Sequence, residues 1–235
     1  MRNFSDELRS RTKDIHKATE VTGFNKRLLD GNATKESYGE FLYSLLPVYV
    51  AIEKNLDALK GDARLAPLVT KELYKSELMK KDIEFILGDK VKELKELEST
   101  KAYVNRINEI GKSNPLGVVA HAYTRFLADL FGGRLFADLI KNHYNIGEGG
   151  LNYYKMDGIG EIMPYVMGYH KKLGALALTD EEVEYFINEV SNSYVYNVGI
   201  STELDAKLFM KDSESKGHPA HSGHPGGHPG GHPHN

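Results

Sequence analysis

The sequence predicts an all-α protein made of a single domain and a C-terminal tail. From about residue 4 to residue 209 the apolar residues recur mostly at helical spacing, and no long stretch keeps the strict alternation of an exposed strand. A chain of 235 residues, 40% of them hydrophobic, is long enough to bury one sizeable core. After residue 216 the composition changes to glycine, proline and histidine, which can bury no core. We therefore expect one domain over residues 1–210 and a disordered tail over 211–235.

Capping residues place the helices along the chain. Ser5, followed by two acids, is a good helix start, because its hydroxyl can accept a free amide hydrogen and acids suit the positive end of the helix dipole. This helix should run to about Thr22. Thr34 can cap a second helix, which is kinked by Pro47 and stops near Gly61. A further helix is expected over 71–97, in one piece or in two around Gly88, and another over 101–111. A longer helix is expected over 116 to about 144, with an interruption at Gly132 and Gly133. The last helix should begin at a capping box at Thr179.

Charge and composition exclude several classes of function. The net charge is −3, and the 30 basic and 33 acidic residues are interleaved, so the chain lacks the broad basic field that binds nucleic acid. Without cysteine there is no disulfide, thiolate ligand or iron–sulfur cluster, which suits a reducing compartment. No window approaches the roughly 20 apolar residues that cross a bilayer, and the opening segment has no apolar targeting region. We expect a cytoplasmic protein with neither a membrane nor nucleic acid as its partner.

The tail holds six of the ten histidines. Several imidazoles on a flexible chain can bind Ni, Cu or Zn ions, so divalent metal binding is one hypothesis. The alternative is a solvated low-complexity extension without such a role. These histidines are His218, His221, His224, His228, His232 and His234.

A first candidate site lies on one face of the predicted first helix, where four polar residues follow the spacing i, i+4, i+7, i+11. Such a face matches a ligand that has both a metal and anionic arms. Glu20 lies one turn beyond His16, where it could accept the N–H of the imidazole and fix the tautomer that binds metal. The alternative is an ordinary amphipathic helix with an exposed charged face. The four residues are Arg9, Lys13, His16 and Glu20.

A second candidate site is the segment HAYTRFLADLFGGRLF, residues 121–136. Two adjacent glycines in an apolar helix, Gly132 and Gly133, cost on the order of 1 kcal/mol each relative to alanine, so they suggest a kink or the close approach of a flat ligand. Asp129, with Arg125 one turn earlier, could organise polar groups or water beside that ligand. The alternative is a helix–helix crossing that needs small residues, with Asp129 and Arg125 as a surface pair.

Two motifs in this order and separation resemble those of a known family. LRSRTKDIHKATE at residues 8–20 resembles the proximal heme helix of the heme oxygenases, and VVAHAYTRFLADLFGG at 118–133 is similar to their distal helix. SLLPVYVAIE, YVNRINEIGKSNP and the spacing of Tyr194 and Asn197 also fall in register. The resemblance extends from about residue 5 to residue 209. It implies a helical bundle with heme between a proximal helix and a kinked distal helix.

The resemblance also implies roles for individual residues. His16 would be the proximal ligand of the heme iron, with Glu20 as its hydrogen-bond partner, whereas His121 falls at a position away from the iron. Basic residues and a tyrosine would face the propionates, and the glycine pair would form a flexible kink over the heme. The further residues implied to bind heme are Arg9, Lys13, Tyr123, Thr124, Gly132, Gly133, His170 and Tyr194, and those implied to form a distal hydrogen-bonded water network are Asp129, Arg125, Tyr49, Tyr103 and Asn197.

The activity that the resemblance implies is oxidative cleavage of heme to biliverdin, carbon monoxide and ferrous iron, so that heme is both substrate and cofactor. The reaction uses O2, and the distal network would deliver protons. Because the sequence has no glycine-rich nucleotide fingerprint, we expect the electrons to come from a separate reductase or a ferredoxin-like donor.

The distal motif departs from the family's pattern at two positions, where Ala128 replaces a glycine and Phe131 replaces a serine. An added methyl group near bound oxygen could displace a water of the network and lower turnover, so a heme-binding carrier or sensor is the alternative function. Retention of Asp129 favours the enzyme, because a carrier needs no distal proton network. The family's basic positions near the second propionate fall on Val166 and His170, which leaves open the ring position that is cleaved.

Overall fold

The computed structural model describes residues 4–210, apart from the side chains of residues 131–135 and 210. Within this part of the chain the regular elements are helices and there is no strand, which confirms the all-α prediction. The tail predicted over 211–235, with its six histidines, lies outside the described residues. The α-helices are α1 (Phe4–Glu20), α2 (Gly23–Leu29), α3 (Lys35–Asp57), α4 (Ser76–Leu87), α5 (Glu98–Ser113), α6 (Leu116–Tyr144), α7 (Ile162–Gly174) and α8 (Asp180–Asp205).

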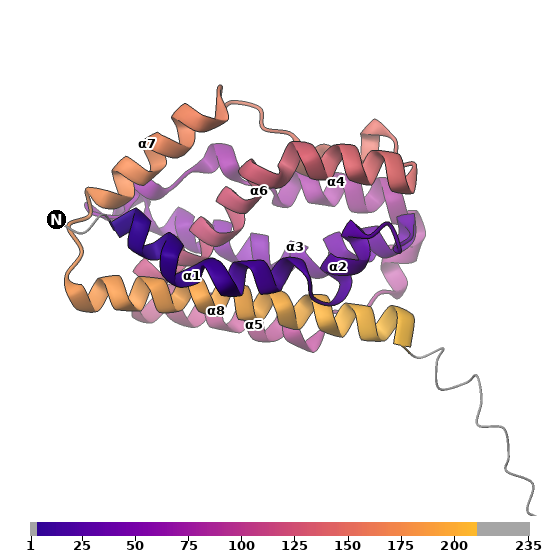
Figure 1. Cartoon of the computed structure of the whole chain (residues 1–235), viewed down its shortest axis with the longest axis horizontal. Coiled ribbons are helices and arrows are strands. Elements are labelled where there is room, and N and C mark those ends of the chain that lie inside the picture. The colour runs from indigo at the N-terminus through magenta and orange to yellow at the C-terminus, as the bar shows by residue number, and fades with distance from the viewer. Residues whose placement is uncertain (1–3, 211–235) are drawn as a thin grey trace, which may run out of the picture.

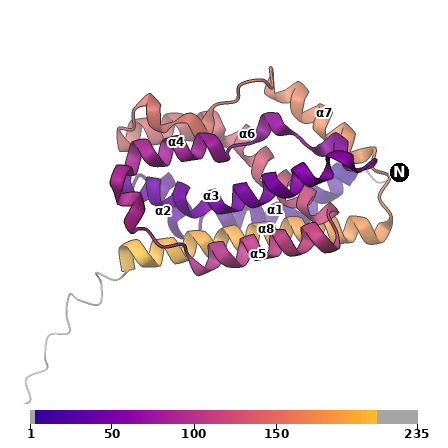
Figure 2. The same cartoon turned by 180° about the vertical axis from the view of Figure 1, so that it is seen from behind.

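Helix α8 organises the bundle, because α1, α2, α5 and α6 all pack against it. Helix α3 lies against α4, α5 and α6. Figures 1 and 2 show α1 running alongside α8, with α7 at the end of the molecule where the chain turns into α8. The first and last helices of the described chain are therefore neighbours. None of the helices between residues 4 and 210 has the length and apolar character needed to span a membrane.

Two of the predicted helix starts are confirmed by their hydrogen bonds. The Thr34 hydroxyl accepts the N–H of Ser37 at 3.0 Å, and the Ser37 hydroxyl accepts the N–H of Thr34 at 2.8 Å. Thr179 and Glu182 form the same reciprocal pair at the start of α8, at 3.0 and 3.2 Å. Hydrogen bonds from Arg64 and then from the backbone of Thr179 lower the pKa of Glu182 to about 2. Each capping box satisfies two amides that would otherwise have no acceptor.

Some of the predicted boundaries are wrong, and the causes are local. The segment expected to be helical over 71–97 does divide at Gly88, which takes a φ of +52°, but the α-helix is only Ser76–Leu87 and 3-10 turns flank it. Helix α2 was not predicted, since its seven residues are too few to show a clear period. It begins at Gly23, which has a φ of +55° and where a Cβ atom would lie 2.7 Å from the carbonyl oxygen of Ser201. Glycine thus allows the chain to turn closely against α8.

The predicted interruption of the helix over 116–144 is also wrong. Helix α6 continues from Leu116 to Tyr144 through Gly132 and Gly133. The helical penalty of about 1 kcal/mol per glycine is opposed by the packing of α6 against α3, α5, α7 and α8. The ribbon of α6 changes direction along its length (Figure 1), so the helix bends without breaking.

Candidate functional site

The polar face predicted for the first helix is exposed on α1. The side chain of His16 is 50% exposed, and its Nε2 lies 3.6 Å from Oε1 of Glu20, one turn later. The centroid of its ring lies 5.3 Å from that of Tyr194 on α8. Arg9 and Lys13 are exposed on the same helix. An accessible imidazole between a carboxylate and an aromatic ring can offer a nitrogen to a metal, with nearby cations for an anionic ligand.

Helix α7 brings His170 beside the first half of α6. Its ring centroid lies 5.8 Å from that of Tyr123, and its Nε2 atom is buried without a hydrogen-bond partner among the described residues. Burial lowers the pKa of His170, and the positive charge of Arg9 lowers it further. Val166, one turn earlier, is buried in the core. Because buried polar atoms are nearly always hydrogen bonded, this free nitrogen fits a polar group of a bound molecule, such as a carboxylate.

The second candidate segment places Asp129 in a buried hydrogen-bond network. Tyr49 of α3 donates to its Oδ2 at 2.7 Å, and Tyr153, in the connection after α6, donates to its Oδ1 at 2.5 Å. Arg125 donates from Nε and Nη2 to the hydroxyl of Tyr49, at 3.1 and 2.8 Å. The Nη1 atom of Arg125 donates to Oδ1 of Asn197 on α8 at 2.8 Å. We call these five residues the Asp129 network.

The interpretation of Asp129 and Arg125 as a surface pair is wrong. Only 8% of the Asp129 side chain and 15% of the Arg125 side chain are exposed, and their nearest nitrogen and oxygen atoms lie 4.0 Å apart. The hydroxyl of Tyr49 bridges them, since it accepts from Arg125 and donates to Asp129. Arg125 is therefore hydrogen bonded to the carboxyl group only indirectly, through a phenol.

Burial determines the protonation of the Asp129 network. It raises the pKa of Asp129, and the charge of Arg125, followed by the hydrogen bonds from Tyr153 and Tyr49, opposes this rise without cancelling it. Burial also raises the pKa of both phenols well above the ordinary value. Desolvation opposes the charge of Arg125, but the neighbouring phenols and Asp129 keep its pKa high. The network thus combines a charged guanidinium, two neutral phenol donors and a carboxyl group with a raised proton affinity.

Tyr103 lies in a neighbouring network and does not bond Asp129 directly. Its hydroxyl lies 2.6 Å from Oγ of Ser193 and 3.0 Å from Nδ1 of His121. Asn197 donates to the backbone oxygen of Ser193 at 2.7 Å, so α8 connects the two networks. Of the five residues that the resemblance assigns to a distal network, direct hydrogen bonds join Asp129, Tyr49, Arg125 and Asn197, while Tyr103 is linked through α8.

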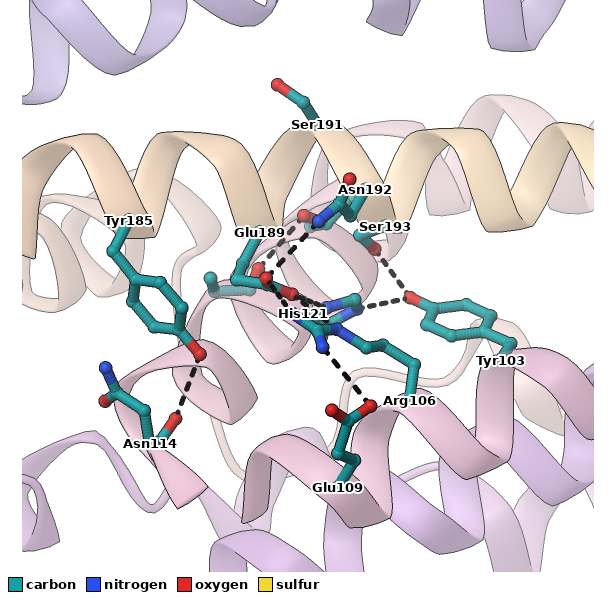
Figure 3. A network of polar contacts seen from close by, with 12 residues as sticks. Tyr103, Arg106, Glu109, Asn114, His121, Tyr185, Glu189, Ser191, Asn192 and Ser193 are labelled. Carbon is teal, nitrogen blue, oxygen red and sulfur yellow. Dashed lines mark hydrogen bonds and ion pairs between the residues drawn. The ribbon is translucent and has the colours of Figure 1, made fainter. Parts of the chain in front are cut away.

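His121 is buried between α5 and α8 (Figure 3), and both of its ring nitrogens have partners. Its Nδ1 faces Tyr103, and its Nε2 lies 3.0 Å from Oε2 of Glu189. Arg106 also binds Glu189. Burial opposes the charge of Glu189, but hydrogen bonds from His121 and Arg106 lower its pKa to about 2. His121 therefore has no nitrogen free for a metal, in agreement with its expected place away from the iron. We call Glu189, His121 and Arg106 the Glu189 network.

The other predicted residues of the distal helix have simpler surroundings. Thr124 is buried, and its hydroxyl donates to the carbonyl oxygen of Ala120 at 3.0 Å, so it supports the helix itself. Ala128 is exposed, one residue before the buried Asp129. The side chain of Phe131 lies outside the described set. Contacts of heme with this part of α6 stay predictions.

Tyr153 is the member of the Asp129 network that the sequence analysis missed. It lies in a short 3-10 turn, Asn152–Tyr154, that shows no period of its own, and it is separated from Asp129 by 24 positions. The only signal in the sequence is a pair of tyrosines in an otherwise mixed connection, NYY, which no motif marks.

Helix α8 supports both parts of the site. Tyr194, beside the ring of His16, and Asn197, bonded to Arg125, lie three positions apart on it and so on neighbouring parts of its surface. The fold and the site together define an all-helical protein in which a helix bearing an accessible histidine and a buried, proton-holding network share one supporting helix.

Comparison with known proteins places this arrangement in a family. The family model described as heme oxygenase matches residues 2–203. The chain is 32% identical to a heme oxygenase of Guillardia theta, over 89% of this chain and 90% of that protein, and 31% identical to heme oxygenase 2 of Rattus norvegicus, over 95% and 73%. Heme oxygenase-1 of Synechocystis, solved in complex with heme, superposes with a TM-score of 0.84 at 27% identity, over 91% of this chain and 97% of that one. The chain therefore belongs to the heme oxygenase family.

This membership confirms the family predicted from the two motifs and, with it, the helical fold. Heme oxygenases are oxidoreductases that cleave heme to biliverdin, with heme as substrate and cofactor and with O2 and external electrons as the other reactants.

Proposed function

We propose that this chain cleaves heme to biliverdin, carbon monoxide and ferrous iron, with His16 as the iron ligand and the Asp129 network as the proton source. The observation that carries the proposal is the state of Asp129, a buried carboxyl group held by the hydroxyls of Tyr49 and Tyr153. A carboxyl group with a raised pKa can hold a proton and release it during a reaction.

The residues of α1, α6 and α7 fit heme as a ligand. The accessible imidazole of His16 suits an iron, and Arg9 and Lys13 suit the two carboxylates of heme. The unpartnered Nε2 of His170 supplies one more polar atom that a carboxylate could satisfy. Aromatic rings at Tyr123 and Tyr194 add apolar surface for a flat macrocycle.

When bound, heme supplies the iron at which O2 is reduced and the ring that is opened. The part of this chain is to hold and pass protons in fixed positions. The two hydrogen bonds from Arg125 to the oxygen of Tyr49 leave the proton of that hydroxyl directed at Asp129. Because these donors are already in place, they need not reorganise when charge develops nearby. The glycines Gly132 and Gly133 would let the backbone of α6 approach a flat ligand closely.

The electron donor, the location and the role of the tail belong to the same proposal. A separate reductase or a ferredoxin-like protein would supply the electrons, because the sequence carries no nucleotide fingerprint. The absence of cysteine is compatible with the cytoplasm. Metal binding by the tail histidines is tested by truncation after Lys216: unchanged iron release and unchanged binding of divalent metal would leave the tail without that role.

A heme-binding carrier or sensor is the second candidate function. It is favoured by Ala128, whose methyl group stands one residue before Asp129 where the family has a glycine. A carrier would use His16 and the basic residues but would have no use for the protons of Asp129.

Reconstitution with one equivalent of hemin, followed by addition of a reductant and O2, tests the proposal. Loss of the Soret band with formation of biliverdin and release of iron is the expected result. His16→Ala should lose tight heme binding, whereas the matched variant His143→Ala, at another exposed histidine, should keep it. A stable heme complex without ring opening would favour the carrier, and tight heme binding by His16→Ala would exclude His16 as the ligand.

A further inference from the structure

We propose that Tyr153 is a positioning residue for Asp129, and that Asp82 and Lys75 hold it in place so that it fixes one carboxylate oxygen while Tyr49 fixes the other. This inference rests on the function proposed for Asp129. Tyr153 lies outside both family motifs. Asp82 is a buried residue of α4, and Lys75 is the buried N-cap residue of that helix.

Among the described residues, those that bond the hydroxyl of Tyr153 are all members of the Asp129 network: Asp129, Tyr49 and Arg125. Its side chain is buried, and its hydroxyl lies 2.5 Å from Oδ1 of Asp129 and 2.7 Å from the hydroxyl of Tyr49. The rings of Tyr49 and Tyr153 meet edge to face, with centroids 5.9 Å apart. Since Tyr49 bonds Oδ2, both carboxylate oxygens are occupied and the plane of the carboxyl group is fixed.

Asp82 of α4 holds the backbone of this turn. Its Oδ2 accepts the N–H of Tyr153 at 2.7 Å, and its Oδ1 accepts the N–H and the side-chain amide of Asn152, both at 2.8 Å. Asp82 is fully buried, and burial raises its pKa against the effect of these hydrogen bonds. A buried carboxylate with three donors is strongly held in one orientation, so it sets the position of the turn.

Lys75 holds the same segment two residues after Tyr153, at Lys155. The residue is 2% exposed, and its Nζ donates to the carbonyl oxygen of Lys155 at 2.5 Å and lies 3.4 Å from Sδ of Met156. Its own backbone is fixed to α3, because Oε1 of Glu53 accepts the N–H of Lys75 at 2.7 Å. A buried ammonium group is costly unless it is paired, and this one bonds to the segment that carries Tyr153.

The contacts of Asp82 and Lys75 explain how a short turn can take part in a rigid network. The turn has only three residues, and its position depends on what its backbone bonds to. Hydrogen bonds to a carboxylate favour the charged form, so Tyr153 lowers the pKa of Asp129 against the effect of burial. Tyr153 thus helps to set the pH at which Asp129 releases its proton.

The test is a titration of the Asp129 carboxyl group by 13C NMR in the heme-free full-length chain, with the resonance assigned by its loss in Asp129→Asn. Tyr153→Phe removes the hydroxyl and keeps the ring, and should raise the pKa of Asp129 by on the order of one unit. A fluorinated tyrosine at position 153 is a more acidic donor and should lower it. Tyr154→Phe is the matched control, since the ring centroid of Tyr154 lies 5.0 Å from that of Tyr153 but no described hydrogen bond joins its hydroxyl to Asp129.

An unchanged titration in Tyr153→Phe, or an equal shift in Tyr154→Phe, would overturn the proposal. If Tyr153→Phe fails to fold, the fluorinated tyrosine decides: a lowered pKa supports the proposal, and an unchanged one overturns it. The pH profile of heme cleavage should move in the same direction as the carboxyl titration. Because the NMR titration needs no heme, a shifted carboxyl in a chain that does not cleave heme would contradict the proposed function alone.

Discussion

Two buried networks include residues of α6, and each holds a carboxylate and an arginine, but they differ in how the arginine meets the carboxylate. In the Glu189 network, Arg106 and His121 bond the carboxylate oxygens directly. In the Asp129 network, the guanidinium of Arg125 stays 4.0 Å from the carboxylate and donates its hydrogen bonds to the hydroxyl of Tyr49. The pKa is lowered to about 2 at Glu189 and is raised at Asp129.

The way in which the arginine meets the carboxylate distinguishes Glu189, which stays charged, from Asp129, whose carboxyl group can exchange a proton. A carboxylate bonded directly to a cation stays ionised through the physiological range and holds helices together. A carboxyl group bonded to neutral phenols, with the cation one group further away, keeps part of the effect of burial and can change its protonation. Burial alone therefore does not tell which carboxyl group can change its protonation, whereas the identity of its direct donors does.

The largest expected effect is the loss of heme cleavage in Asp129→Asn. Without the exchangeable proton, the rate should fall by roughly 10²- to 10⁴-fold, because asparagine keeps the shape but cannot hold and release the proton. Heme affinity and the free energy of unfolding should stay close to those of the wild type. Single-turnover kinetics with reconstituted hemin give the rate. A rate in Asp129→Asn equal to that of Glu189→Gln would remove the functional distinction between the networks.

The next largest effect is on stability and concerns Glu189→Gln. This change leaves Arg106 without its buried counter-charge and should lower the free energy of unfolding by about 3 kcal/mol. The rate of heme cleavage per folded molecule should stay within a few-fold of the wild type. Urea denaturation measures the loss, and a stability equal to that of the wild type would mean that the ion pairs of the Glu189 network contribute no net stability.

The pH dependence of stability sharpens the same contrast. The pKa of Glu189 is 4.5 when unperturbed and about 2 in the folded protein, so its contribution is fully present above the unfolded value and is lost as the pH falls toward 2. Between these values the slope of stability against pH should be smaller in Glu189→Gln, by up to about 1.4 kcal/mol per pH unit. Parallel curves for the two proteins would contradict the lowered pKa.

The smallest expected effect comes from Ala128→Gly, which restores the family's residue beside Asp129. If the methyl group displaces a water of the network, its removal should raise the rate of heme cleavage by on the order of two- to five-fold, which corresponds to less than about 1 kcal/mol in the barrier. The added glycine should also lower the stability of α6 by about 1 kcal/mol. An unchanged rate with lowered stability would show that the methyl group does not hinder turnover.

Local signals in the sequence predicted the starts of α3 and α8, because a capping box depends on residues three positions apart. The resemblance to a family supplied Asp129, Arg125 and most of their partners. Helix α7 was not predicted: Pro164 and Gly168 interrupt its apolar pattern, and both are weak helix formers. Tyr153 was not predicted because its position depends on Asp82 and Lys75, which contact its segment over 70 or more positions.

The docking of α1 and α2 on α8 has a consequence for the synthesis of the protein. Arg11 bonds Glu184 across 173 positions, Asn25 bonds Ser201 across 176 and Arg27 bonds Asp205 across 178. A nascent chain that ends before α8 therefore lacks the surface on which the His16 helix rests, although that helix precedes all the other described helices in the chain. We expect heme capture to begin only once α8 has emerged, so that released chains truncated before residue 180 bind hemin more weakly than chains that extend past residue 210.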